Sequence, residues 1–324
     1  LSQMGARGYG ITYNATFSSE WSLFIKLKNP IFKQKRTKNI KKKLLLFVAA
    51  MMTALVLAAC GSDDSNTSSS SKGEDGEQAS GGVLKVGMEA GYPPFNWTQQ
   101  DDSNGAVKID GSAEYAGGYD VEIAKKVAEG LGKELVIVKM AWDGLVPALQ
   151  SGVVDAIIAG MSPTDKRKES IDFTENYYTS DFVIVVKKGG AFEDAKTLAD
   201  FEGAKITSQL GTTNYNVIEQ IPNVQLQTAM EDFSAMRVAV QSGVIDGYVA
   251  ERPEAVSATA ANENFAYVEL EQGFKTDPAD TAVAIGVRKD YDLTEKMSEI
   301  IKTISEEERM KLMDEAIANQ PSQQ

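Results

Sequence analysis

The chain has 324 residues, enough for two domains, and its 43% hydrophobic and 24% charged residues are ordinary for a globular protein. It contains no histidine and a single cysteine, which excludes histidine-based triads, histidine-ligated zinc, thiolate metal clusters and an intrachain disulfide. Residues 1–59 carry a charge of +9 and the remaining residues −22, so we expect the body to bind neither nucleic acid nor an anionic lipid surface.

The first 59 residues have the organisation of a secretory signal. A basic segment, 1–43, precedes sixteen uncharged and mostly apolar residues at 44–59, fewer than the ~20 that span a membrane. A short membrane anchor that stays in place is the alternative. Small residues then lead into Cys60, and this end of the segment resembles the bacterial lipoprotein signal. The resemblance implies lipidation of Cys60 and removal of everything before it.

Residues 60–82 are mostly Ser, Asp, Gly, Glu and Lys, with almost nothing apolar. Such a composition cannot bury enough apolar surface to fold, so we predict a disordered tether. A flexible coil of this length spans roughly 25 Å root-mean-square. The folded body therefore begins at Val83.

The first part of the body alternates strands with helices. Two adjacent prolines, Pro93 and Pro94, end the first strand, and the polar residues 98–118 are predicted as a surface hairpin or loop. Asp120 is the predicted N-cap of the next helix, which ends at Gly132. The expected strands are 83–88, 135–139 and 155–159, and the expected helices are 121–131 and 145–151. Alternation of this kind predicts an α/β fold with a doubly wound, parallel sheet.

A second alternating set follows a buried-type strand at 182–187, which we interpret as a crossing between two lobes. Residues 281–288 cross back, and two helices after residue 293 are expected to pack on the first lobe. The predicted first lobe is 83–187 plus 280–324, the second is 188–279, and the two crossings form a hinge. In the second lobe we expect helices near 197–201, after 212 and at 232–241, and strands at 205–208, 224–226 and 245–249.

An internal repeat supports two lobes built on one plan. Residues 148–159, ALQSGVVDAIIA, return at 239–250 as AVQSGVIDGYVA, with seven of twelve positions identical. In each copy a helix ends at a glycine, a short apolar strand follows, and polar residues stand just beyond it. Ligands of open α/β sheets bind beyond the carboxyl ends of strands, so two such ends facing each other predict a cleft.

Five motifs resemble those of the solute-binding proteins that supply polar amino acids to bacterial ABC importers, the type II periplasmic-binding fold. The motifs are GYPPF at 91–95, GYDV at 118–121, WDGLVPAL at 142–149, GMSPTDKR at 160–167, and IDF at 171–173 before Tyr177 and Tyr178. The resemblance covers residues 83–320, nearly the whole body. It implies two doubly wound lobes, two hinge strands and an amino acid held in the cleft between them.

Arg167 is the predicted carboxylate ligand. A guanidinium binds a carboxylate through two parallel hydrogen bonds, which a lysine cannot do. Thr164 can cap the helix that carries Arg167, and the Ser162 hydroxyl can donate or accept. From charge alone, a solvated basic turn at residues 166–168 is the favoured interpretation. The family resemblance places the carboxylate-binding arginine at Arg167.

Glu251 is the predicted ligand of the ammonium group. It stands at the repeat equivalent of Gly160, where the family usually has Asp, so its longer side chain is a departure. A surface ion pair with Arg252 is the alternative. On the second lobe, where a strand meets a helix N-terminus, the expected ligand-binding edge is Gln209, Gly211, Thr212 and Thr213. Thr212 is expected to bind the carboxylate, to cap its helix, or both.

Tyr92 and Trp142 are predicted to form the walls of the side-chain pocket, or else to lie in the core. Glu89 ends the first strand, where the family often has an acid that contacts the ligand side chain. An acid between two aromatic rings favours arginine or lysine over glutamine; a bond to a neighbouring backbone group or to the ammonium is the alternative. The predicted ligand-binding residues are Glu89, Tyr92, Trp142, Gly160, Ser162, Arg167, Gln209, Thr212, Thr213 and Glu251.

The predicted function is capture of a polar amino acid, specifically a basic one, by hinge closure and its delivery to a membrane permease. We expect a monomer, anchored by lipid at Cys60 outside the cytoplasm of a bacterium, without cofactor or metal. Two alternatives stay open. One is an enzyme on the same fold, such as a dehydratase or hydrolase, for which Glu89 and Glu251 are the candidate acids. The other is an amino-acid sensor that uses the same clamp without transport.

Overall fold

The computed structural model describes residues 81–321. The predicted signal, Cys60 and nearly all of the tether lie outside these residues. Within them, no helix combines the length and apolar character needed to cross a membrane.

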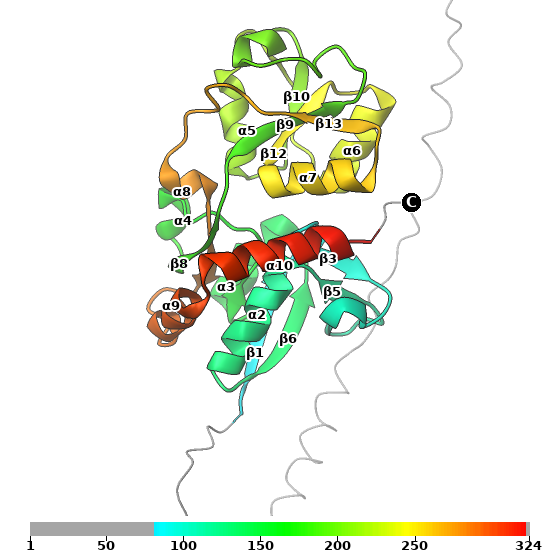
Figure 1. Ribbon diagram of the computed structural model, residues 1–324. Coiled ribbons are helices and arrows are strands. Elements are labelled where there is room, and N and C mark those ends of the chain that lie inside the picture. Colours follow the sequence, from blue (N-terminus) through cyan, green and yellow to red (C-terminus); the bar gives the residue numbers. More distant parts are fainter. Residues whose placement is uncertain (1–80, 322–324) are drawn as a thin grey trace, which may run out of the picture. The chain divides into compact units, whose positions relative to one another are not determined.

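The first sheet contains five strands in the order β6-β1-β7-β14-β8. Strands β1, β6 and β8 are labelled in Figure 1. Strands β6, β1 and β7 are parallel to each other, whereas β14 runs antiparallel to both β7 and β8. The sheet is therefore mixed, and not wholly parallel as predicted. Helices α2, α3 and α9 pack against this sheet, and α10 packs on α2. The bounds are Val83–Met88 (β1), Glu134–Lys139 (β6), Ala156–Ile157 (β7), Asp172–Thr179 (β8), Ala282–Val287 (β14), Tyr119–Gly130 (α2), Leu145–Ser151 (α3), Thr294–Thr303 (α9) and Glu306–Asn319 (α10).

The second sheet repeats this plan in the order β11-β10-β12-β9-β13, with β9 as the antiparallel strand. Its elements are Phe182–Lys187 (β9), Lys205–Thr207 (β10), Gln225–Leu226 (β11), Gly247–Glu251 (β12), Phe265–Val268 (β13), Thr213–Asn216 (α5), Phe233–Ser242 (α6) and Arg252–Ala261 (α7). The predicted boundary after residue 187 is therefore too late. All of β9 is hydrogen-bonded into the second sheet, and the chain crosses at Ser180 and Asp181.

We call residues 83–179 and 282–321 the first lobe and residues 182–268 the second. Two crossing segments, 180–181 and 269–281, connect them; the latter contains α8, Pro278–Thr281. A small antiparallel sheet in the first lobe confirms the predicted surface hairpin, with strands Gly91–Tyr92 (β2), Asn96–Gln99 (β3), Val107–Lys108 (β4) and Tyr115–Gly117 (β5). The remaining short turns of helix are Ser103–Gly105, Trp142–Gly144, Asp165–Lys168 (α4), Leu198–Phe201 and Val217–Gln220.

The sequence repeat is also a structural repeat. Its two aspartates, Asp155 and Asp246, accept hydrogen bonds from the backbone N–H groups of Lys85 and Lys205, at 3.0 and 2.8 Å. Each bond ties the start of the repeat's strand, which is central in its sheet, to the neighbouring parallel strand, β1 or β10. Both repeat helices end at a glycine in the left-handed region, with φ of 78° at Gly152 and 75° at Gly243. The two lobes thus present equivalent strand ends.

Helix α2 begins differently from the prediction. Its N-cap is Gly118, whose φ of 119° and closeness to the Phe95 carbonyl, 2.4 Å from a built Cβ, require glycine. Asp120 does not cap the helix; its side chain is completely buried. The sequence pattern identified the helix but not the role of this acid.

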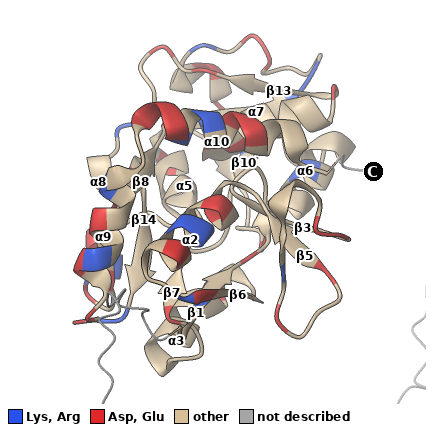
Figure 2. Ribbon diagram, turned by 60° about the horizontal axis from the view of Figure 1, so that its bottom comes forward, with Lys and Arg blue, Asp and Glu red and all other residues tan. Residues whose placement is uncertain are grey.

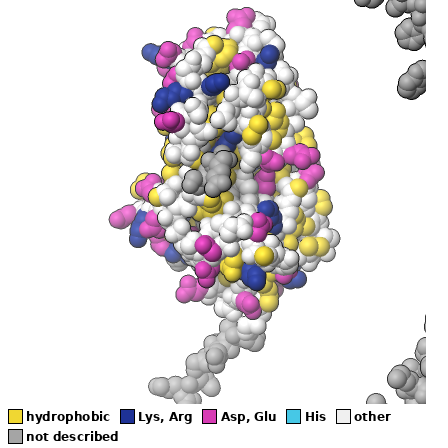
Figure 3. Space-filling model, turned by 90° about the vertical axis from the view of Figure 1, so that its right-hand side faces the viewer, with side chains coloured by type: hydrophobic (Ala, Val, Ile, Leu, Met, Phe, Trp, Pro, Cys, Tyr) yellow, Lys and Arg dark blue, Asp and Glu magenta, His cyan; other side chains and the backbone are white. Residues whose placement is uncertain are grey.

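The C-terminal helices do not both pack on the first lobe alone. Helix α9 contacts α2 and β8, as expected, whereas α10 contacts both α2 and α7 of the second lobe. Beyond α10, the Gln320 amide donates to the Ser257 carbonyl at 3.2 Å. Both acidic and basic residues occur along α9 and α10 (Figure 2). A face at right angles to the view of Figure 1 likewise carries charges of both signs, interspersed with hydrophobic side chains (Figure 3).

Candidate functional site

A narrow cavity lies between the carboxyl ends of the strands of the two lobes. It encloses about 290 Å³ of empty space, including its mouth. Nine of the ten predicted ligand-binding residues line it, and Glu89 lies beside it. The lining residues are Tyr92, Trp142, Ala159, Gly160, Ser162 and Arg167 from the first lobe, and Gln209, Thr212, Thr213, Asn214, Phe233 and Glu251 from the second.

Arg167 reaches the cavity from the short helix α4. The N-cap of this helix is Thr164, whose side chain accepts from the Arg167 backbone N–H at 3.3 Å, as predicted. The guanidinium donates to the Ser162 carbonyl at 2.9 Å and, across the lobes, to the Gly211 carbonyl at 3.1 Å. It also lies 5.2 Å from the centre of the Trp142 ring. Burial lowers its pKa to about 10, so it stays charged at neutral pH.

Glu251 ends β12 and is buried, with 6% of its surface exposed. Its carboxylate accepts hydrogen bonds from the Tyr92 hydroxyl and, at 2.9 Å, from the Asn214 amide. Burial raises the pKa of Glu251, while these two hydrogen bonds act in the opposite direction. The alternative of a surface ion pair with Arg252 is wrong, because Arg252 pairs with Asp181 and Glu269 instead.

The hydroxyl groups at the site are engaged within the protein. Ser162 and Thr213, from opposite lobes, both donate to the backbone carbonyl of Asp280 in α8, at 2.9 and 3.3 Å. Thr212 caps α5 by accepting from the Tyr215 N–H and donates its own proton to the Gln209 carbonyl at 2.7 Å. Of the two roles expected for Thr212, capping of its helix is therefore present in the structure.

Glu89 meets the second lobe through Gln209. The Gln209 amide donates to both carboxylate oxygens of Glu89, each at 3.0 Å, and to the Glu231 carbonyl at 2.9 Å. Burial raises the pKa of Glu89 to about 7, and the charge of Asp232 adds to the rise. Glu89, Glu231 and Asp232 line an open groove next to the cavity, together with Lys139 and Trp142. The mouth of the site on this side is therefore mainly acidic.

Three lining residues, Ala159, Asn214 and Phe233, were missed by the sequence analysis. Asn214 is the second residue of α5, and its amide binds Glu251. Phe233 begins α6 and stacks on Tyr92, with ring centres 4.4 Å apart, while Phe95 stacks on the other side of Tyr92 at 5.1 Å. Tyr92 is thus both a wall of the cavity and part of the core, so its two interpretations hold together.

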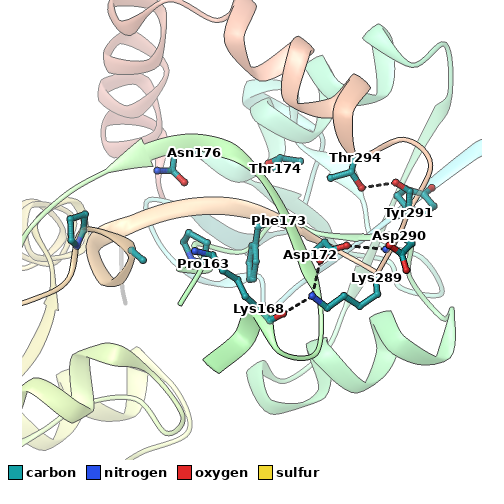
Figure 4. Close-up of a pocket in the computed structure, with 12 residues that line it drawn as sticks. Pro163, Lys168, Asp172, Phe173, Thr174, Asn176, Lys289, Asp290, Tyr291 and Thr294 are labelled. Atoms are coloured by element: carbon teal, nitrogen blue, oxygen red, sulfur yellow. Dashed lines mark hydrogen bonds and ion pairs between the residues drawn. The ribbon is translucent and has the colours of Figure 1, made fainter. Parts of the chain in front are cut away.

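A wider groove on the first lobe, beside α8 and the start of α9, contains none of the predicted residues (Figure 4). Its charges are largely paired with each other. Lys289 lies 2.8 Å from a carboxylate oxygen of Asp172 and donates to the Lys168 carbonyl at 2.6 Å. The second oxygen of Asp172 accepts from the Asp290 N–H at 2.9 Å. With these groups satisfied, the groove offers little to orient a ligand, and we assign it none.

Comparisons with known proteins agree with the geometry. Residues 84–317 match the family described as bacterial extracellular solute-binding proteins, family 3. The chain is 34% identical to a probable histidine-binding protein of Campylobacter jejuni over 198 residues, 57% of this chain and 71% of that one. It is 30% identical to the arginine-binding extracellular protein ArtP of Bacillus subtilis over 238 residues, 71% and 84% of the two chains.

A solved structure is similar as well. An amino acid ABC transporter substrate-binding protein from Streptococcus pneumoniae, bound to L-arginine, superposes with a TM-score of 0.65 at 30% identity. The superposition covers 73% of this chain and 94% of that one.

Proposed function

The chain belongs to the bacterial extracellular solute-binding proteins of family 3, and from this premise we propose that it captures a free basic amino acid for an ABC importer. The observation that carries the proposal is the pair of opposite charges at the cavity. Arg167 comes from the first lobe and Glu251 from the second, and both line the same narrow space. A free amino acid carries a carboxylate and an ammonium on adjacent atoms, which these two groups match.

Binding and closure are coupled in this proposal. Arg167, Glu89 and Glu251 each take part in a hydrogen bond that crosses between the lobes. The narrow cavity must widen before an amino acid can enter, so we propose that the crossing segments bend to open it. A ligand held by Arg167 on one lobe and Glu251 on the other then favours the closed arrangement through its contacts with both.

The nature of the ligand side chain is proposed from the acidic groove. A basic side chain that extends from the cavity past Trp142 meets Glu89 first, with Glu231 and Asp232 beyond it. A carboxylate there attracts a cation, and the aromatic ring stacks on a guanidinium or an alkyl chain. The relatives named for arginine and histidine support the same class of ligand. Arginine is our first choice and lysine the second.

Three further parts of the proposal concern the setting of the protein. The closed form docks on a membrane permease, the chain acts as a monomer, and a lipid on Cys60 holds it outside the cytoplasm. The acidic body fits a protein that stays in solution next to a membrane on a tether. Mass spectrometry of the protein purified from membranes of a bacterial host tests the lipid directly, through a mass increase confined to the peptide that contains Cys60.

An enzymatic role is the alternative that one observation favours. The pKa of Glu89, about 7, is suited to general acid–base catalysis. However, Gln209 binds both of its oxygens, and the groups around it match a cationic side chain equally well. We therefore propose binding without turnover. Recovery of chemically unchanged arginine after prolonged incubation supports this proposal, and conversion of the amino acid contradicts it.

Thermal unfolding in the presence of each of the twenty amino acids tests the proposed function. A ligand at 100 times its dissociation constant stabilises the folded state by about 2.7 kcal/mol, which corresponds to an increase in Tm of about 5–10 °C. We expect such an increase with arginine, a similar or smaller one with lysine, and none with aspartate or glutamate. Equal Tm values with all twenty would contradict the proposal.

The pH dependence of arginine binding tests the role of Glu89. Below its pKa of about 7 the free protein carries a neutral Glu89, so a cationic ligand must bind with loss of that proton. Arginine affinity should then fall about tenfold for each pH unit below 7, or roughly 30-fold between pH 8 and pH 5.5. Glu89→Gln should bind arginine weakly and with a much smaller pH slope. If Glu89→Gln keeps the wild-type pH dependence of arginine affinity, the group that titrates is not Glu89.

A further inference from the structure

Beneath the cavity lies a buried acid that the proposed ligand contacts do not use. Asp120, in the first turn of α2, is completely inaccessible to solvent. One carboxylate oxygen accepts the Tyr177 hydroxyl at 2.7 Å and the other accepts the Asn96 amide at 2.8 Å. Burying a carboxylate costs stability, and well-packed apolar residues often serve folding equally well. A structural role alone therefore gives a weak account of this acid.

The Tyr177 hydroxyl connects Asp120 to the cavity wall. Its single proton goes to Asp120, which leaves the oxygen free to accept the Gly160 backbone N–H, at 3.2 Å. The hydrogen bonds therefore run in one direction, from Gly160 through Tyr177 to Asp120. With the carboxylate ionised, the bond between Tyr177 and Asp120 is charge-assisted and about twice as strong as a neutral one.

Gly160 forms part of the cavity surface through its backbone. Its φ is 65°, in the left-handed region, and a Cβ built on it would lie 3.0 Å from the Tyr92 ring. The peptide at this position has no side chain to hold it in place. Its orientation relative to the neighbouring Ser162 and Arg167 thus depends on what binds its N–H group.

We propose that Asp120 is a positioning residue: acting through Tyr177, it fixes the Gly160 backbone in the orientation that the ligand requires. The inference rests on the proposed function, because it concerns the same cavity. Asp120 does not contact the ligand. Its immediate partners are Tyr177, Asn96 and the Gly160 backbone, and the hydroxyls of Tyr92 and Tyr119 are the other titratable groups close to it.

Two tyrosines of the same cluster provide a matched test. Tyr119 and Tyr177 are both fully buried, and each loses one buried hydroxyl on substitution by phenylalanine. The Tyr119 hydroxyl donates to the Tyr177 carbonyl at 2.9 Å and does not bind Gly160. We expect a decrease in Tm for both variants, larger for Tyr177→Phe because it loses a charge-assisted bond, but a rise of about tenfold in the Kd for arginine only for Tyr177→Phe.

The NMR resonance of the Gly160 amide provides a second measurement, which a general loss of stability does not change. In ¹H–¹⁵N spectra of the ligand-free chain, the Gly160 resonance should shift in Tyr177→Phe and stay in place in Tyr119→Phe. This measurement is independent of ligand binding. It therefore reports on the hydrogen bond even if the proposed function fails.

Substitutions of Asp120 itself supply a conservative rescue. Among the described residues, the Asn96 Oδ1 atom is buried without a hydrogen-bond partner. In Asp120→Asn the new amide can donate to this atom once the Asn96 amide turns by about 180°, while its oxygen still accepts from Tyr177. We expect Asp120→Asn to bind arginine within about threefold of wild type and Asp120→Leu to lose at least about tenfold.

Three outcomes separate the possibilities. Equal Kd values for Tyr119→Phe and Tyr177→Phe, with wild-type binding intact, would overturn the positioning role and leave the proposed function in place. An unshifted Gly160 resonance in Tyr177→Phe would also overturn it. Absence of amino-acid binding by the wild-type chain would refute the proposed function and, with it, the positioning role.

Discussion

Replacing Arg167 with lysine should weaken arginine binding by about 100- to 1000-fold and leave the protein folded. Lysine keeps the positive charge but cannot offer two parallel donors to a carboxylate while also holding the Ser162 and Gly211 carbonyls. Loss of two charge-assisted hydrogen bonds at about 1.5–2 kcal/mol each, the lower part of their usual range, sums to ~3–4 kcal/mol and gives this weakening. Titration calorimetry measures the affinity, and thermal unfolding without ligand measures the fold.

Arg288 offers a matched control for this substitution. Its guanidinium also donates to backbone carbonyls, those of Leu149 and Val154, and lies 5.0 Å from the centre of the Tyr291 ring. It does not line the cavity between the lobes. Arg288→Lys should therefore cost stability comparably and leave arginine affinity within about twofold. Equal losses of affinity in the two variants would mean that Arg167 acts through packing and does not hydrogen-bond the ligand carboxylate.

Replacing Glu251 with glutamine should lower affinity by at least about 100-fold while the ligand-free protein becomes no less stable. The amide removes the charge that faces the ligand's ammonium, which is then buried without its partner. The same change relieves the cost of burying the carboxylate, whose pKa is raised by that burial. Glu251→Asp, the residue usual in the family, should retain binding within about tenfold.

Glu254 is the appropriate comparison, because it is also completely buried and stands three residues away. It pairs with Arg237 at 2.7 Å and accepts from the Tyr248 hydroxyl at 3.0 Å, but it does not line the cavity. Glu254→Gln should cost about 3–5 kcal/mol of stability by leaving Arg237 without its ion pair. Arginine affinity should change little. If both glutamine variants lose affinity equally, Glu251 has no special role toward the ammonium.

Much of the architecture could be predicted because it repeats. The shared pattern of helix, glycine and apolar strand identified two sheets of the same plan, and Asp155 and Asp246 occupy equivalent positions in them. The strand β9 was assigned to the wrong lobe, because an apolar run signals burial without saying which sheet it joins. Hydrogen-bond partners in a sheet come from distant parts of the chain and leave no local pattern.

The site could be predicted where a motif marks it, and less well where it depends on contacts between the lobes. Arg167 lies within a dense local motif. Phe233 enters the site because the second lobe faces Tyr92 of the first. Asn214 follows the predicted Thr212 and Thr213, but its bond to Glu251, 37 residues further along the same lobe, leaves no local pattern in the sequence. Asp120 was interpreted as a helix cap, since an acid at the start of a helix usually is one. Its burial depends on Asn96 and Tyr177, which are distant in sequence.

Calorimetric titration of the purified chain with L-arginine at pH 8 is the most direct test of amino-acid capture. Opposite charges at the two ends of the cavity, an aromatic wall and Glu89 predict a single site with a Kd of about 1 µM or below, near −8 kcal/mol. Parallel titrations with lysine, glutamine and cystine rank the ligand side chains. The absence of binding heat with all four, from protein that unfolds cooperatively on heating, would contradict the proposed capture of a polar amino acid.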